Sequence, residues 1–175
     1  MINNVLKAAQ LSQVEISIVK AEDKEILNNL LSYHMHDLSE FVDDLNINEK
    51  GFFQFDAIDM YFEKDSLIPL LYKVNGEYAG FVLLNKPPYA PKDIDYCINE
   101  FFILKRYRRK GYAKAAIEKV FTMYPGKYVV LQVKKNIAAV SFWHSVYEKC
   151  NIIYKERELE FDGCDSLLQE FTVDK

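Results

Sequence analysis

Residues 99–124 constrain the fold of this chain more than any other stretch, because two secondary-structure patterns meet there across a short cationic turn. Residues 101–104, Phe-Phe-Ile-Leu, form a continuous apolar run, which predicts a strand covered on both faces. After Gly111 the apolar residues change to helical spacing. They predict an amphipathic helix with one apolar face formed by Ala113, Ile117, Val120, Phe121 and Tyr124.

The junction between this strand and helix is strongly cationic and lacks a capping side chain. A helix N-terminus already carries partial positive charge and unpaired N–H groups, and no Ser, Thr, Asp or Asn precedes Gly111 to cap it. The chain instead supplies five basic residues, Lys105, Arg106, Arg108, Arg109 and Lys110. We therefore expect a phosphate group to bind at this helix N-terminus, although a basic run by itself is also typical of a solvated loop.

The composition predicts one globular domain over residues 1–175. Half of the residues are hydrophobic and 14% are aromatic, which excludes the disordered class, and the length is too short for two full domains. A net charge of −4 with one short basic cluster argues against a nucleic-acid partner. No apolar run approaches the ~20 residues that span a membrane, and no signal peptide is recognisable, so we expect a cytoplasmic protein without a membrane partner.

The cysteine and histidine residues give no sign of a metal site. Cys97, Cys150 and Cys164 are widely spaced, which predicts reduced structural thiols; a nucleophilic cysteine would lack an identifiable partner. His34 and His36 alternate instead of following the spacing of helical metal ligands. We expect each histidine to lie on the surface or to line a groove, and we predict no metal.

The remaining segments predict a mixed, mostly antiparallel sheet of six or seven strands flanked by about four helices, an α/β (α+β) fold. Two tight turns, Asn75-Gly76 and Asp162-Gly163, join antiparallel strands. The expected strands cover residues 14–19, 67–74, 78–84, 127–133, 151–161 and 167–173 in addition to the central one. The expected helices begin near residue 21, near residue 57, after Gly111 and at Asn136, which is a good N-cap.

Two segments together resemble the GNAT superfamily of N-acetyltransferases. Residues 108–113, Arg-Arg-Lys-Gly-Tyr-Ala, match its Arg/Gln-x-x-Gly-x-Gly/Ala signature, where the loop and helix start cradle the pyrophosphate of acetyl-CoA. Residues 136–143, Asn-Ile-Ala-Ala-Val-Ser-Phe-Trp, resemble the Asn-x-x-Ala motif that flanks the thioester and pantetheine arm. The resemblance is to an uncharacterised bacterial branch of predicted acetyltransferases. It implies a single-domain GNAT fold and transfer of an acetyl group from acetyl-CoA to a primary amine by direct attack.

The resemblance also implies which residues hold the cofactor. The backbones of Phe101 and Ile103 would pair with the pantetheine amides, and backbone N–H groups after Arg108 would hold the pyrophosphate, assisted by the Arg108 side chain. Asn136 would contact the pantetheine arm. The complete predicted cofactor-binding set is Phe101, Phe102, Ile103, Arg108, Arg109, Lys110, Gly111, Tyr112, Ala113, Asn136, Ala139, Phe142 and Trp143.

Three residues are predicted to take part in catalysis. The N–H of Ile103 would donate to the developing oxyanion, and Glu100, or a water that it holds, would deprotonate the amine; Glu100 is equally well explained as a strand-end carboxylate. Trp143 stands where the family motif carries a tyrosine, and an indole cannot transfer a proton. Tyr147, one turn later, or a water would then protonate the leaving thiolate, unless the thiolate leaves unaided.

An acidic stretch follows the first predicted helix. In the family this region forms much of the acceptor groove, so its carboxylates would attract a cationic amine, although a solvated surface explains them equally well. They are Asp37, Glu40, Asp43, Asp44, Asp59 and Glu63. The competing functional hypothesis is a non-catalytic acyl-CoA binding or sensing module. We expect a monomer or a homodimer.

Overall fold

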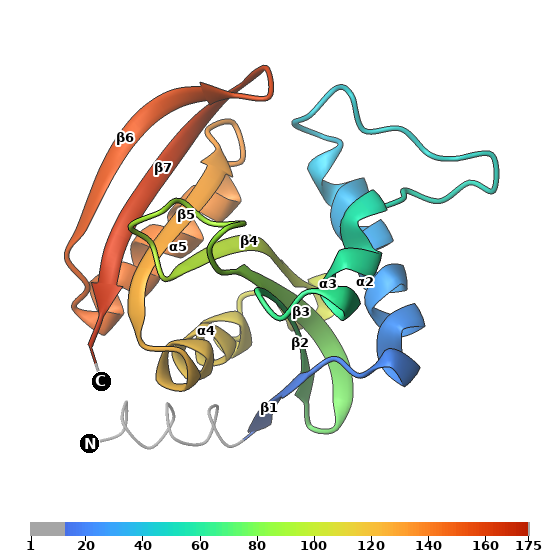
Figure 1. Ribbon diagram of the computed structural model, residues 1–175, viewed down its shortest axis with the longest axis horizontal. Coiled ribbons are helices and arrows are strands. Elements are labelled where there is room, and N and C mark those ends of the chain that lie inside the picture. Colours follow the sequence, from blue (N-terminus) through green and yellow to red (C-terminus); the bar gives the residue numbers. More distant parts are fainter. Residues whose placement is uncertain (1–12, 175) are drawn as a thin grey trace.

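In the computed structural model, which describes residues 13–174, strands form one mixed sheet (Figure 1). Its order is β1-β2-β3-β4-β5-β7-β6, and all neighbours are antiparallel except β4 and β5, which are parallel. The seven strands of the described residues are β1 (Val14–Ile18), β2 (Leu67–Val74), β3 (Glu77–Asn85), β4 (Tyr96–Ile103), β5 (Gly126–Val133), β6 (Tyr154–Phe161) and β7 (Cys164–Val173). This sheet confirms the predicted class.

Four α-helices of residues 13–174 cover the two faces of the sheet. Helices α2 (Lys24–Leu38) and α3 (Met60–Glu63) pack on one face, and α4 (Tyr112–Met123) and α5 (Ile137–Cys150) pack on the other (Figure 1). Short 3₁₀ turns precede three of them, at residues 21–23, 56–59 and 105–107. None of the helices between residues 13 and 174 is long and apolar enough to cross a membrane.

Both predicted tight turns are confirmed. Asn75 and Gly76 have φ angles of 53° and 81°, and Asp162 and Gly163 have φ angles of 47° and 73°. Two consecutive positive φ angles are the signature of the two-residue hairpin turn, which suits the twist of the strands that it joins. The turns set the register of β2 with β3 and of β6 with β7.

Strand β4 begins at Tyr96, earlier than the apolar run predicted, because its first residues pair with β5. The parallel pairs are Tyr96↔Tyr128, Cys97↔Val129 and Ile98↔Val130, and none follows within the described residues. The pairing of β4 with β3 shifts register at Asn99, since Leu83 faces Glu100 and Leu84 faces Ile98. Such an extra residue bends a strand. Beyond Ile98, β4 and β5 therefore separate, while β5 keeps its pairing with β7 along its whole length.

Candidate active site

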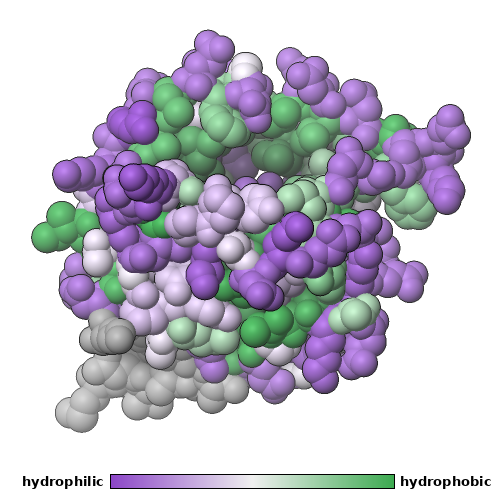
Figure 2. All heavy atoms as spheres, in the orientation of Figure 1, coloured by the Kyte–Doolittle hydropathy of each residue, from purple (hydrophilic) through white to green (hydrophobic). Residues whose placement is uncertain are grey.

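The separated ends of β4 and β5 expose backbone groups of β4 to a gap in the sheet. The N–H of Leu104 donates to the Ala79 carbonyl on the β3 side, at 2.9 Å. Because successive peptide groups of a strand alternate sides, the N–H groups of Phe101 and Ile103 face the β5 side. Figure 2 shows a hollow lined by apolar residues in the upper half of the molecule, over the place where β4 and β5 part in Figure 1.

An aromatic cluster joins the open end of β4 to α5. The ring of Phe101 stacks on Phe142 with a centroid distance of 5.2 Å, and it lies 6.0 Å from the ring of Trp143. Trp143 is buried. The open end of β4 and the start of α5, which carries the second of the two segments that resemble the family, are therefore packed side by side in the structure. Asn136 caps α5 by accepting a hydrogen bond from the N–H of Ala139 at 3.1 Å, which confirms the predicted N-cap.

The N-terminus of α4 has no side-chain cap and no acidic residue in its first turn. Gly111 is the N-cap residue and has a φ angle of 83°, and Arg109 before it has a φ angle of 58°. This left-handed backbone favours glycine. The N–H groups of Tyr112 and Ala113 lie in the first turn, where an α-helix offers no intrahelical acceptor. The arrangement is suited to hold an anion, as the sequence predicts.

Arg108 holds this cationic turn against β4 and α2. Its Nε donates to the Ile103 carbonyl at 2.9 Å, and its Nη2 donates to Asp37 at 2.5 Å, while Lys105 Nζ lies 3.1 Å from the same carboxylate. Burial alone would raise the pKa of Asp37, but the hydrogen bonds from Arg108 and Lys105 hold it below its ordinary value. The predicted contact of the Arg108 side chain with pyrophosphate stays a prediction, and so does the attraction of an acceptor amine by Asp37, whose carboxylate holds the turn in this structure.

Glu100 lies on the face of β4 opposite to Phe101 and pairs with His34, for which the sequence predicts only a position on the surface or along a groove. His34 Nε2 lies 2.6 Å from Glu100 Oε2, and the two side chains are 15% and 24% exposed. The His34 ring packs against Phe81 and Phe102 at centroid distances of 5.7 and 5.6 Å. His34 follows Leu27 and Leu30 at helical spacing, so the buried stripe of α2 was a usable signal.

Two titratable groups near Glu100 keep their protons. Burial, followed by the charge of Glu100, raises the pKa of Cys97 to about 11. The same causes raise the pKa of Tyr61, whose hydroxyl donates to Asn85 Oδ1 at 2.6 Å. A protonated Cys97 thiol agrees with the predicted structural role. Between residues 13 and 174, no three His, Cys, Asp or Glu side chains gather in a way that could hold a metal ion.

Tyr147 points into the core between α5 and the sheet. Its side chain is 1% exposed, and its hydroxyl donates to Gln169 Oε1 at 2.7 Å. Burial, followed by the neighbouring Tyr154 and Glu156, raises the pKa of Tyr147. A proton donor must reach the leaving group. Because the Tyr147 hydroxyl is buried and bonded to Gln169, its position does not favour the predicted role as proton donor to the leaving thiolate.

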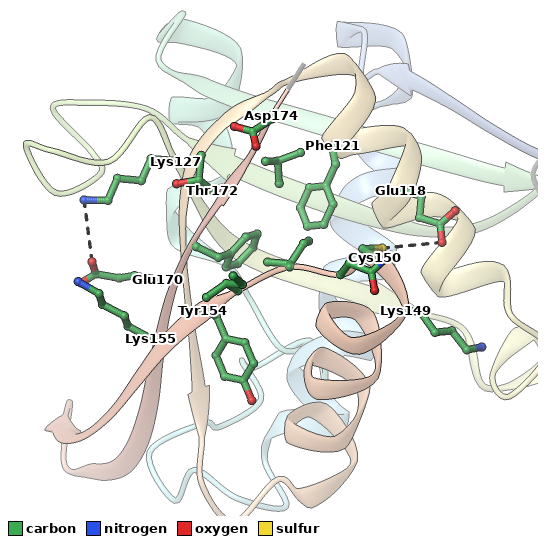
Figure 3. Close-up of a pocket in the computed structure, with 15 residues that line it drawn as sticks. Glu118, Phe121, Lys127, Lys149, Cys150, Tyr154, Lys155, Glu170, Thr172 and Asp174 are labelled. Carbon is green, nitrogen blue, oxygen red and sulfur yellow. Dashed lines mark hydrogen bonds and ion pairs between the residues drawn. The ribbon is translucent and has the colours of Figure 1, made fainter.

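The described structure has a hollow outside the predicted site. It has a volume of about 940 Å³ and lies between α4, the end of α5 and the β6–β7 hairpin (Figure 3). Lys127 and Glu170 form an ion pair at 4.0 Å at one side, and Cys150 Sγ lies 3.9 Å from Glu118 at the other. None of the predicted site residues lines it. A smaller hollow of about 500 Å³ lies between the end of α2 and residues 44–57.

A comparison with protein-family models finds a match to the acetyltransferase (GNAT) family over residues 30–150. The chain belongs to the GNAT acetyltransferase family. The matched region runs from α2 to the end of α5, so it includes the open end of β4, the cationic turn and the aromatic cluster. The predicted family is therefore confirmed. No curated protein matches the chain.

Solved structures of GNAT proteins share the fold of this chain at low sequence identity. RimL, a ribosomal L7/L12 alpha-N-protein acetyltransferase solved with coenzyme A, has a TM-score of 0.68 and 13% identity; 93% of this chain and 96% of that one are covered. Salmonella typhimurium YncA, solved with its cofactor acetyl-CoA, has a TM-score of 0.64, 9% identity and coverages of 93% and 95%. A GNAT acetyltransferase from Streptococcus pneumoniae has a TM-score of 0.60, 17% identity and coverages of 92% and 99%.

Proposed function

We propose that this protein transfers an acetyl group from acetyl-CoA to a primary amine by direct attack. The observation that carries the proposal is the gap between β4 and β5, with the uncapped N-terminus of α4 at one end and the aromatic cluster of α5 beside it. A strand edge with free N–H groups next to a cationic helix start suits a ligand that has amides at one end and phosphates at the other. Acetyl-CoA is such a ligand.

The cofactor side of the site uses mainly backbone groups. The first-turn N–H groups of α4, with those of Arg109 and Lys110, would hold the pyrophosphate, and Gly111 gives this anion room. The N–H groups of Phe101 and Ile103 would pair with the pantetheine amides. Phe142 and Trp143 form the apolar wall of the arm. Two of the structural neighbours, RimL and YncA, were solved with coenzyme A and acetyl-CoA, which supports this assignment.

The acceptor side of the site would remove a proton from the amine. We assign Glu100 as the base, held by His34 at 2.6 Å, because this half-buried carboxylate stands on the same strand, β4, as the proposed oxyanion donor, Ile103 N–H. The amine nitrogen forms a bond to the thioester carbon and gives its proton to Glu100, and the carbon–sulfur bond breaks. The thiolate leaves and takes a proton from water, so no role for Tyr147 is needed.

A non-catalytic acyl-CoA sensor is the second candidate function. Trp143 at the position of the motif tyrosine and the buried hydroxyl of Tyr147 favour it, because neither residue supplies a proton to the thiolate. Our proposals of a cytoplasmic location, of a cationic amine as acceptor and of a monomer or homodimer rest on the sequence expectations alone.

The test is release of free thiol from acetyl-CoA in the presence of amines, polyamines, aminoglycosides and peptide N-termini, with calorimetric binding of acetyl-CoA measured in parallel. We expect binding and thiol release with one class of amine. Binding without release across the panel would favour the sensor. Absence of acetyl-CoA binding would contradict both functions.

A further inference from the structure

A buried hydrogen-bond network beside the gap between β4 and β5 ends in an unsatisfied acceptor. Gln132 on β5 and Gln169 on β7 are 6% and 0% exposed, and Gln132 Nε2 donates to Gln169 Oε1 at 2.8 Å. The other amide atom, Gln132 Oε1, has no hydrogen-bond partner, and among the described residues it is the only such buried side-chain nitrogen or oxygen. Buried polar atoms nearly always have partners, because leaving one without a partner costs stability. Gln132 Oε1 therefore calls for an explanation.

The network itself dictates the direction of each hydrogen bond. Glu156 Oε2 lies 2.7 Å from His144 Nε2 and accepts from Gln169 Nε2 at 2.6 Å. The hydrogen bonds from His144 and Gln169 lower the pKa of Glu156, so it is an ionised carboxylate that can only accept. Gln169 must turn its NH₂ toward Glu156. Its oxygen then faces inward, where it accepts from the Tyr147 hydroxyl at 2.7 Å.

This directionality fixes the side chain of Gln132. Because Gln169 turns its side-chain oxygen toward Gln132, Gln132 must donate a hydrogen bond from its NH₂ group. The alternative orientation of the Gln132 amide would bring two carbonyl oxygens together, which is repulsive. The oxygen of Gln132 is thus turned away from the network by a chain of constraints that begins at Glu156 on β6.

Gln132 lies just beyond the point where β5 stops pairing with β4. The last residue of β5 that pairs with β4 is Val130, and Gln132, two residues further, shares its face of the sheet. Val130, Trp143 and Tyr147 belong to one core cluster, so this face is the one covered by α5. The N–H groups of Phe101 and Ile103 face the gap from the β4 side, and Gln132 lies at the β5 edge of the gap with its side chain on the α5 face.

We propose that Gln132 Oε1 accepts a hydrogen bond from an amide N–H of the pantetheine arm, with Gln169 and Glu156 as positioning residues. This inference rests on the proposed acyl-CoA binding. The pantetheine arm has two amide groups, and one of them would supply the donor that the protein lacks. The network would set this acceptor in place before the cofactor binds, which avoids the cost of ordering it on binding.

The decisive variant is Gln132→Leu. It removes the unsatisfied acceptor, while Gln169 Oε1 keeps its hydrogen bond from Tyr147. Without cofactor, the variant should therefore melt at the same temperature as the wild type or higher. Its dissociation constant for coenzyme A should rise about tenfold, the effect of one hydrogen bond in a dry site. Its dissociation constant for adenosine 3′,5′-bisphosphate, which lacks the pantetheine arm, should stay unchanged.

Calorimetry on the wild type and the variants separates the outcomes. Gln54→Leu, the same substitution on an exposed loop residue, is the control and should change neither affinity. Equal losses for both ligands would assign Gln132 a purely structural role, and unchanged coenzyme A binding would assign the acceptor to a water; either result overturns the inference and leaves the proposed function intact. Failure of the wild type to bind coenzyme A would instead overturn the proposed function.

A second variant keeps the inference testable if Gln132→Leu does not fold. Glu156→Gln replaces the acceptor-only carboxylate by an amide that can also donate, so Gln169 is no longer held in one orientation. We expect a smaller rise in the coenzyme A dissociation constant, about threefold, again without an effect on adenosine 3′,5′-bisphosphate. An unchanged affinity for coenzyme A would remove Glu156 from the proposal.

Discussion

The two faces of the open end of β4 differ in chemistry, although their residues alternate along one strand. Glu100 and Phe102 face α2, where a carboxylate and a histidine form a partly exposed pair. Phe101 and Ile103 face α5, where aromatic rings and a buried amide network surround the gap. The pleat of the strand places these environments on opposite sides of a few residues. One strand end can therefore serve proton removal on one face and cofactor binding on the other.

Because the α2 face and the α5 face of β4 differ in chemistry, substitutions on the two faces should have separable effects. Changes on the α5 face and at the start of α4 should weaken acetyl-CoA binding. Changes on the α2 face should lower turnover and leave acetyl-CoA binding intact. A variant that affects both quantities equally would show that the two faces are not independent.

Gly111→Glu, on the cofactor side, should weaken acetyl-CoA binding more than any other substitution proposed for this face. A carboxylate at the helix start would occupy the place of the pyrophosphate and repel it, and any side chain at a φ angle of 83° costs about 1–2 kcal/mol in backbone strain. We predict a loss of acetyl-CoA affinity of about 100-fold or more, measured by calorimetry.

Gly163→Glu is the matched control for this variant. Gly163 has a similar φ angle of 73° in the β6–β7 turn, and a Cβ atom there would meet nothing within 4 Å. It carries the same strain and the same charge in a turn that contains none of the proposed cofactor-binding residues, so its acetyl-CoA affinity should equal that of the wild type. An equal loss in both variants would mean that strain, and not the anion site, explains the result.

Glu100→Gln should separate the two faces most clearly. The amide has the shape of the carboxylate but cannot take a proton from the amine. We predict that kcat falls about 100-fold, within the range for loss of a general base, while the dissociation constant for acetyl-CoA stays unchanged. Glu160→Gln on the exposed strand β6 is the control. A normal kcat in Glu100→Gln would show that the carboxylate is a strand-end residue without a catalytic role.

Features set by local sequence could be predicted, and contacts between distant segments could not. The tight turn at residues 75–76, the Asn136 cap and the uncapped start at Gly111 depend on neighbouring residues only, and the structure has them as expected. His34 and Glu100 are 66 residues apart. Their pairing depends on how α2 crosses the sheet, which the periodicity of each segment does not specify.

The cationic turn shows the same limit. The sequence predicts a site with excess positive charge, because all of its basic residues are local. The structure supplies Asp37, which is 71 residues from Arg108, to hold two of these cations. The helical spacing of Asp37 from Leu30 and His34 places it on the buried stripe of α2, and this spacing was the one sequence signal for the contact.

Asp37→Asn should lower stability in a pH-dependent way. Because the folded-state pKa of Asp37 is lowered, its contribution is present above the unfolded value of about 3.9 and is lost as the pH falls through the folded value. We predict that the variant is about 1–2 kcal/mol less stable at pH 7, and that the difference shrinks below about pH 4. Urea unfolding across this range measures it, with the exposed Asp43→Asn as control. A difference that persists at pH 3 would contradict the ion-pair explanation.

Substitutions of His34 should have modest effects that distinguish two explanations for this residue. If the residue holds Glu100 by a hydrogen bond, His34→Phe should lower kcat about fivefold, and His34→Gln, which can still donate, should recover most of that loss. If the residue only fills space between Phe81 and Phe102, the order reverses, because phenylalanine keeps the ring packing that glutamine loses. Acetyl-CoA affinity should not change in either variant. His36→Phe, on the exposed side of α2, should leave kcat unchanged. The ranking of the two kcat values therefore decides whether α2 contributes to the chemistry of β4 or only covers it.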